Sequence, residues 1–181
     1  MLYYYEGCVN YCARSMWCLW MRIKVAFFKG KGNWINKIVR WWTKSPYSHA
    51  ELIMSDNETW ISISPFLTSK LDAIRKESYI INNWDIVEID ITQEQHKALL
   101  EFYSETRGSS YDWFGMLLSQ FFPLKIKRYK RWYCSEWIAY ALRTSGVLNW
   151  KIVKTYERPD LSPGELFRLL KENKIGEIKI C

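Results

Sequence analysis

Apolar residues follow two spacings along the chain, and each spacing predicts a different kind of element. Alternation of apolar and polar residues, or a short dense apolar run, predicts a β-strand. Strands are therefore predicted at 22–28, 48–54, 58–64, 84–91 and 175–180. The turn sequence "SDN" separates the second and third of these segments, so we expect them to pair as antiparallel neighbours.

Helical spacing and N-terminal capping residues predict the helices. Thr92 and Gln95 match a capping box, and Ser162 and Glu165 match a second one with Pro163 between them. The predicted helices are 34–44 after Asn33, 93–107, 110–122, 135–144 and one that begins after Ser162. This mixture indicates an α+β fold with a small antiparallel sheet packed against helices.

The length of 181 residues suits one domain, which we place at residues 21–181. Residues 1–20 read unlike the rest, so we expect an N-terminal extension and hypothesise that translation starts at Met21. No basic and apolar leader is visible, and no apolar run reaches the roughly 18 residues of a membrane span. The expected location is the cytoplasm, with peripheral membrane association or delivery in a phage or virion left open.

Charge and cysteine content narrow the classes of partner. The formal net charge is +7, and five positive charges fall in seven residues at 125–131. This favours an anionic partner, which could be nucleic acid, an anionic membrane surface or an acidic polymer. The cysteines number five, an odd count that suits no closed disulfide framework. A zinc site at the N-terminal three is not expected, because zinc needs about four nitrogen or sulfur ligands and no histidine lies near these cysteines.

Cys134 stands where a basic run meets an apolar helical segment, in "RYKRWYCSEWIAYAL" (128–142). Every residue from 137 to 142 is apolar or aromatic, so the predicted helix should be buried on most of its circumference. The free N–H groups and the dipole at its N-terminus favour a thiolate at Cys134, as would nearby lysine and arginine side chains. The alternative is that Cys134 is a small buried apolar residue.

The chain has two histidines that could serve Cys134 as a base. His96 lies in a predicted amphipathic helix near Leu99 and is expected to pack. His49 begins a predicted strand, where period-two alternation places it on the same face as Glu51. A carboxylate there could orient the imidazole, although an exposed polar pair on a sheet face is the alternative.

Three segments in this order resemble a known family. "YSHAEL", then "GSSYDWFGML" (108–117), then "WYCSEWIAYAL" is similar to the circularly permuted branch of the NlpC-type papain-like cysteine hydrolases. That branch contains the YaeF/YiiX-type amidases, and lecithin retinol acyltransferase is a more distant relative. In the permuted branch the histidine strand precedes the cysteine helix, as it does here.

The resemblance implies a papain-like fold and a role for each matching residue. Cys134 would be the nucleophile and His49 the general base. Glu51 would orient His49, with Ser62 or Ser64 on the next strand as alternatives for that third position.

The remaining site assignments concern substrate. Tyr111 and Ser135 are expected to bind substrate or to shape the oxyanion site. The backbone N–H of Cys134 would be one oxyanion donor.

The implied activity is that of a cysteine hydrolase or acyltransferase, which cleaves an amide, ester or thioester through an acyl-enzyme on Cys134. The expected substrate is a peptide, a peptidoglycan-type amide or a lipid acyl group, and no metal or cofactor is needed. Two alternatives stay open: a non-enzymatic module that binds nucleic acid or another anionic ligand, and an inactive descendant that only binds.

Overall fold

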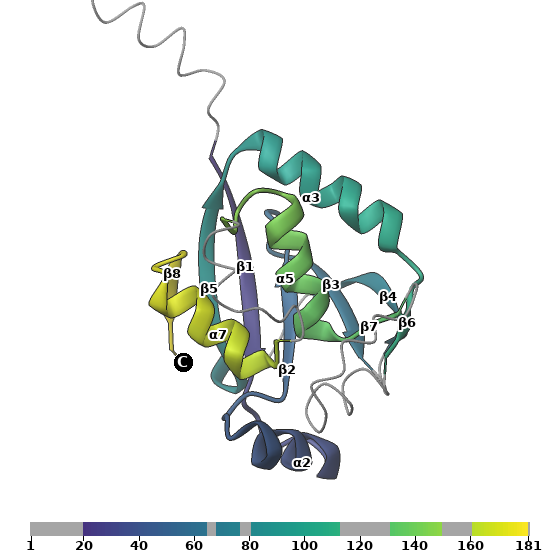
Figure 1. Ribbon diagram of the computed structural model, residues 1–181, viewed down its shortest axis with the longest axis vertical. Helices are drawn as coiled ribbons and strands as arrows, with labels where there is room; N and C mark the ends of the chain where they lie inside the picture. Colours follow the sequence, from purple (N-terminus) through teal and green to yellow (C-terminus); the bar gives the residue numbers. More distant parts are fainter. Residues whose placement is uncertain (1–19, 65–67, 77–80, 113–130, 150–160, 181) are drawn as a thin grey trace, which may run out of the picture.

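A single curled sheet organises the computed structural model, which describes residues 20–64, 68–76, 81–112, 131–149 and 161–180 (Figure 1). Within these residues the sheet has eight strands in the order β7-β6-β4-β3-β2-β1-β5-β8. Neighbouring strands are antiparallel except β6 and β7, which are parallel. The strands are β1 (Met21–Phe28), β2 (His49–Ile53), β3 (Thr59–Ser64), β4 (Thr68–Arg75), β5 (Trp84–Ile91), β6 (Ser110–Tyr111), β7 (Arg131–Trp132) and β8 (Glu177–Lys179).

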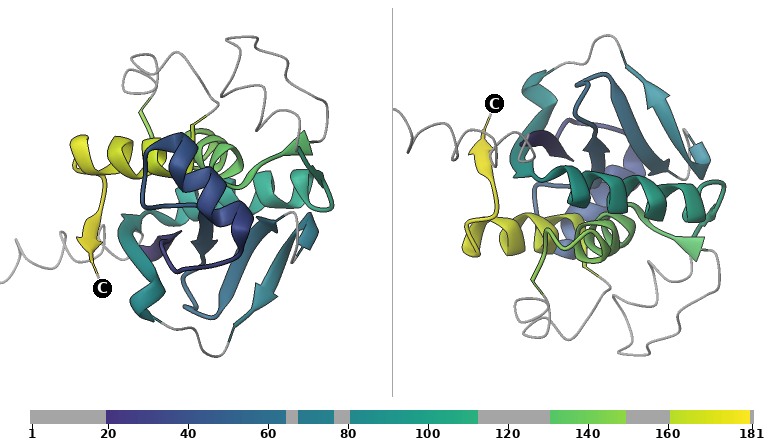
Figure 2. Two further views of the ribbon diagram at one scale, coloured as in Figure 1. Left: turned by 90° about the horizontal axis from the view of Figure 1, so that it is seen from below. Right: turned by 90° about the horizontal axis from the view of Figure 1, so that it is seen from above.

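Helices cover one face of this sheet and one of its ends. They are α2 (Trp34–Thr43), α3 (Gln93–Thr106), α5 (Cys134–Thr144) and α7 (Pro163–Glu172), with a short 3-10 turn, η1, at Ile81–Asn83. The helices α3, α5 and α7 lie on the same side of the sheet, whereas α2 lies at the end where β2 begins (Figures 1 and 2). Among the described residues, no helix has the length and apolar character needed to cross a membrane.

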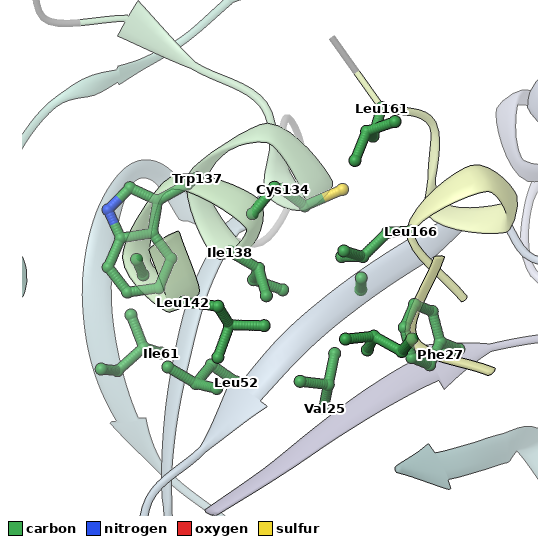
Figure 3. Packing of buried hydrophobic residues seen from close by; sticks show 14 of the residues in the cluster. Val25, Phe27, Leu52, Ile61, Cys134, Trp137, Ile138, Leu142, Leu161 and Leu166 are labelled. Atoms are coloured by element: carbon green, nitrogen blue, oxygen red, sulfur yellow. The ribbon is translucent and has the colours of Figure 1, made fainter. Parts of the chain in front are cut away.

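The central helix α5 is buried because apolar residues occupy nearly its whole circumference. Trp137, Ile138 and Leu142 are almost fully buried, and they pack toward Leu52 of β2 and Ile61 of β3 (Figure 3). Each such side chain contributes about 1.5–3 kcal/mol through removal of apolar surface from water. The N-terminus of α5 is therefore held firmly against the sheet.

The opposite face of the sheet is concave. Trp60 of β3 and Trp84 of β5 have ring centroids 5.4 Å apart, although β2 and β1 lie between their strands. In a flat sheet those two strands would be about 14 Å apart, since neighbours are spaced by about 4.8 Å. The curl brings the two rings together and encloses a second apolar cluster, which consists of Ala26, Ile53, Trp60, Trp84 and Ile86.

The predicted α+β class is confirmed, but the sheet is larger than predicted. The strand β4, "TSKLDAIR", was missed because its polar residues hide any alternation. The helix predicted at 110–122 is wrong at its start, because Ser110 and Tyr111 form β6; residues 113–122 lie outside the described part. That strand depends on long-range pairing of Ser110 with Lys70 and of Tyr111 with Trp132. Residues 1–19 of the predicted extension also lie outside it.

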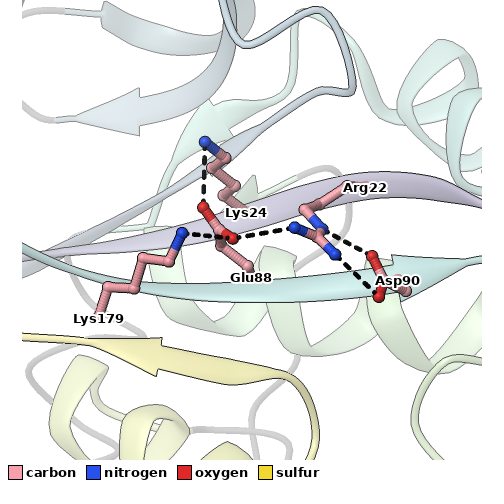
Figure 4. Close-up of polar contacts among 5 residues, drawn as sticks. All are labelled: Arg22, Lys24, Glu88, Asp90 and Lys179. Atoms are coloured by element: carbon pink, nitrogen blue, oxygen red, sulfur yellow. Dashed lines mark hydrogen bonds and ion pairs between the residues drawn. The ribbon is translucent and has the colours of Figure 1, made fainter.

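A cluster of ion pairs ties the last strand to the sheet. Glu88 of β5 is buried and pairs with Lys179 of β8 at 2.9 Å, with Lys24 of β1 at 3.2 Å and with Arg22 at 3.4 Å (Figure 4). Arg22 also binds Asp90, at 2.7 Å. Burial alone would raise the pKa of Glu88, but Lys179 and Lys24 outweigh it and hold that pKa below its ordinary value.

Glu88→Gln is expected to lower the free energy of unfolding by about 1 kcal/mol at neutral pH, since the cations around Glu88 are partly exposed to solvent. Because the folded pKa is lowered, the contribution of Glu88 is complete above its unfolded pKa and is lost as the pH falls through the folded pKa. The variant and the wild type should therefore converge well below pH 4.3, the ordinary glutamate pKa being about that value. Urea unfolding at neutral pH and at the acidic pH measures the free energy of unfolding of both proteins. Asp90→Asn, which removes one side of an exposed ion pair, should lower that free energy less than Glu88→Gln does.

Candidate active site

Cys134 is the first residue of α5, at the point where the helix meets β2. The preceding residue, Tyr133, has an extended backbone and occupies the N-cap position of α5. The backbone N–H groups of Ala50, on β2, and Ser135, on α5, both donate hydrogen bonds to the Cys134 sulfur. Only 6% of Cys134 is exposed. The sulfur thus lies between a helix N-terminus and a strand backbone, both of which present donors to it.

His49 is the first residue of β2 and the partner of the Cys134 thiol. Burial alone would raise the pKa of Cys134, but the charge of His49 and its hydrogen bond to the sulfur outweigh burial. The donors from Ala50 and Ser135 act in the same direction, so the pKa of the Cys134 thiol is lowered. A small apolar residue would need none of these partners.

The same contact stabilises the charged form of His49. Burial by itself would lower the pKa of His49, but Cys134 and then Glu51 raise it to about 10. A lowered thiol pKa beside a raised imidazole pKa describes an ion pair. The contact therefore favours the thiolate form of Cys134 together with the imidazolium form of His49.

Glu51 and Ser62 both reach the far nitrogen of His49. The Nε2 atom lies 3.3 Å from Oε1 of Glu51 and 3.4 Å from Oγ of Ser62. Ser62 Oγ also donates a 2.9 Å hydrogen bond to Oε1 of Glu51. With Nε2 directed at these groups, Nδ1 is the nitrogen left to face the sulfur of Cys134.

The third position of the site is therefore shared between two side chains. The sequence left a choice between Glu51 and a serine on the next strand, and the structure brings both Glu51 and Ser62 to His49. The period-two expectation that His49 and Glu51 share a face is confirmed by their contact. The alternative of an exposed pair is wrong, because Glu51 is 2% exposed.

Lys76, directly after β4, completes the surroundings of Glu51. Its Nζ donates to Oε2 of Glu51 and lies 4.3 Å from the ring centroid of Trp60 and 5.5 Å from that of Trp84. Burial alone would raise the pKa of Glu51, but His49 and then Lys76 lower it to about 2. The carboxylate of Glu51 thus stays charged well below the pH at which an ordinary glutamate is protonated.

Sequence reasoning missed Lys76. It lies at the end of a strand that has no clear alternation, and its neighbours in space, Trp60 and Trp84, come from other strands. No local signal in the sequence connects it to Glu51. The link depends on the curl of the sheet.

Tyr111 lies near Cys134, as expected. It is a buried residue of β6, and burial raises its pKa, with further increases from the negative charges of Cys134 and Asp112. The hydroxyl of Ser135 is directed elsewhere, because it is fully buried and donates to the backbone carbonyl of Leu161. Of Ser135, then, the backbone N–H faces the Cys134 sulfur.

The second histidine is a packing residue, as expected. His96 on α3 contacts Oγ of Ser55 at 3.4 Å, and burial lowers its pKa. Among the described residues, no group of three or more His, Cys, Asp and Glu side chains is arranged to hold a metal ion.

Comparison with known proteins gives no assignment, since no protein-family model and no curated protein matches the sequence. The functional argument therefore starts from the geometry of Cys134, His49, Glu51 and Ser62.

We predict that Cys134 is alkylated by iodoacetamide with an apparent pKa below the value of about 8.5 for a free thiol. In His49→Ala the apparent pKa of the Cys134 thiol should rise to about 8.5 or above, because the thiol stays buried while the His49 cation is lost. Peptide mass spectrometry against pH measures the rate, with Cys181 as a reference thiol and His96→Ala as the matched control. An unchanged apparent pKa in His49→Ala would contradict the ion pair.

Glu51→Gln is expected to lower the pKa of His49, because the substitution removes the buried negative charge while keeping the shape of the side chain. Ser62→Ala should lower it less, since the carboxylate remains. The chain has only two histidines, so their NMR signals can be titrated separately, and His96 serves as an internal reference. A His49 signal that titrates near the ordinary value of about 6.5 in the wild type would exclude the arrangement.

Proposed function

We propose that the chain is a cysteine-dependent hydrolase or acyltransferase of the permuted papain-like type. The carrying observation is the hydrogen-bonded series from Cys134 through His49 to Glu51, with the cysteine at a helix N-terminus. This arrangement supports the roles of nucleophile for Cys134, base for His49 and orienting group for Glu51. The chain order also supports the permuted type, because the histidine strand β2 precedes the cysteine helix α5.

The first half of the proposed reaction forms an acyl-enzyme. The Cys134 thiolate attacks the carbonyl carbon of an amide, ester or thioester, and the carbonyl oxygen gains negative charge. The backbone N–H of Cys134, at the N-terminus of α5, would donate to that oxyanion. The His49 imidazolium then gives its proton to the leaving nitrogen, oxygen or sulfur as the bond to carbon breaks.

The second half releases the acyl group. His49, now neutral, takes a proton from water or from another acyl acceptor. The oxygen, nitrogen or sulfur that has lost this proton attacks the thioester carbon. The Cys134 thiolate leaves, and the imidazolium forms again. Glu51 favours the charged form of His49 at both stages, and Lys76 and Ser62 hold the carboxylate in place.

We predict that purified protein hydrolyses p-nitrophenyl acyl esters, and that Cys134→Ala reduces the rate by a factor of about 10³ or more. His49→Ala should cost about 10²–10⁴-fold through loss of proton transfer. Intact-mass analysis during turnover should find one added acyl group, mapped to Cys134.

The matched control is Cys181→Ala, which should hydrolyse the ester like the wild type. Turnover that survives in Cys134→Ala would overturn the proposed function. Ligand binding without turnover would instead assign the chain to an inactive, binding descendant. Binding of nucleic acid that weakens steeply with salt and survives Cys134→Ala would favour the module that binds anionic ligands.

A further inference from the structure

The helix α2 carries an unusually exposed apolar stripe. Trp34 is 68% exposed, Ile38 43% and Trp41 83%. At about 100° per residue these three positions fall within about 60° of the helix circumference. Large apolar side chains this exposed are few in the described residues, and half of them belong to this stripe. We call these three residues the tryptophan stripe.

The helix is well fixed although its stripe is exposed. The Asn33 side chain caps its N-terminus by accepting from the N–H of Asn36 at 3.1 Å. The Arg40 guanidinium donates to backbone carbonyls of the preceding loop, at Lys29, Gly30 and Lys31. These polar contacts attach α2 to the end of β1 and hold the tryptophan stripe toward solvent.

Positive charge accompanies the stripe. Lys31, Lys37 and Lys44 are exposed, and within the described residues none of them has a carboxylate at ion-pair distance. The helix itself contains no acidic residue. A basic helix with exposed tryptophans suits the boundary between lipid headgroups and acyl chains, where indole rings and lysine side chains both find favourable partners.

We propose that α2 is a docking surface for an anionic lipid bilayer. The helix lies in the plane of the interface, the tryptophan stripe enters the headgroup boundary, and the three lysines contact lipid phosphates. The stripe offers about 500 Å² of apolar surface, whereas a stable protein interface needs about 800 Å² on each partner. Its small area and its unbalanced positive charge therefore fit a lipid surface better than a protein partner.

Docking in this way places the candidate active site at the membrane. The helix α2 leads directly into β2, whose first residue is His49, and it lies at the end of the sheet where β2 begins (Figures 1 and 2). Acyl substrates in the bilayer surface would then be presented to Cys134. This consequence rests on the proposed function, whereas the docking surface does not.

Vesicle sedimentation tests the docking surface with the full chain. Wild-type protein should sediment with vesicles of mixed phosphatidylcholine and phosphatidylglycerol, and the binding should weaken in high salt. The double variant Trp34→Ala/Trp41→Ala should bind at least about 10-fold more weakly. The double variant Lys37→Glu/Lys44→Glu should lose the preference for phosphatidylglycerol. The tryptophan variant should unfold at the same temperature as the wild type, because both rings are largely exposed.

The matched control is Leu100→Ala/Ile180→Ala, which removes two exposed apolar side chains from α3 and the C-terminal segment and should bind like the wild type. Undiminished binding by the tryptophan variant, equal loss in the control, or no binding by the wild type would overturn the proposal. A wild-type dimer that Trp41→Ala dissociates would reassign the stripe to a second copy of the chain and also overturn it. Cys134→Ala should bind vesicles normally, so failure of the proposed function and failure of docking are separate results.

Discussion

The contact between the first turn of α5 and the first two residues of β2 is the constraint on which the site depends. Cys134 starts the helix, His49 starts the strand, and the Ala50 N–H donates to the sulfur between them. Neither element could shift along the other without separating the ion pair. The apolar side chains of α5 resist such a shift, because Ile138 and Leu142 pack against β2 and β3.

The buried carboxylate of Glu51 carries the largest desolvation cost in this arrangement, and the curl of the sheet brings together the groups that offset it. Moving Glu51 out of water costs several kcal/mol unless charges and donors surround it. The concave face supplies His49 on one side and Lys76 on the other, with Ser62 donating to the oxygen that faces His49. Trp60 and Trp84 hold the Lys76 cation over their ring faces.

Local pattern predicted much of the fold and two of the site's partners. Capping residues located α3 and α7, and alternation located β1, β2, β3 and β5, because these signals act within a few residues. His49 and Glu51 were paired by the same rule. β4, β6 and Lys76 could not be found this way, since each is defined by contacts with strands distant in the sequence. The choice between Glu51 and Ser62 likewise needed the register of β2 against β3.

The charged groups around the Cys134 sulfur balance one another. Cys134, His49, Glu51 and Lys76 alternate in sign and cancel, and each opposite pair is in direct contact. The lowered pKa of the Cys134 thiol has its causes, within the described residues, in His49 and in the backbone donors of Ala50 and Ser135. The proposed attraction to an anionic phase and the proposed activation of the thiol are then separate properties, carried by α2 and by the contact between α5 and β2.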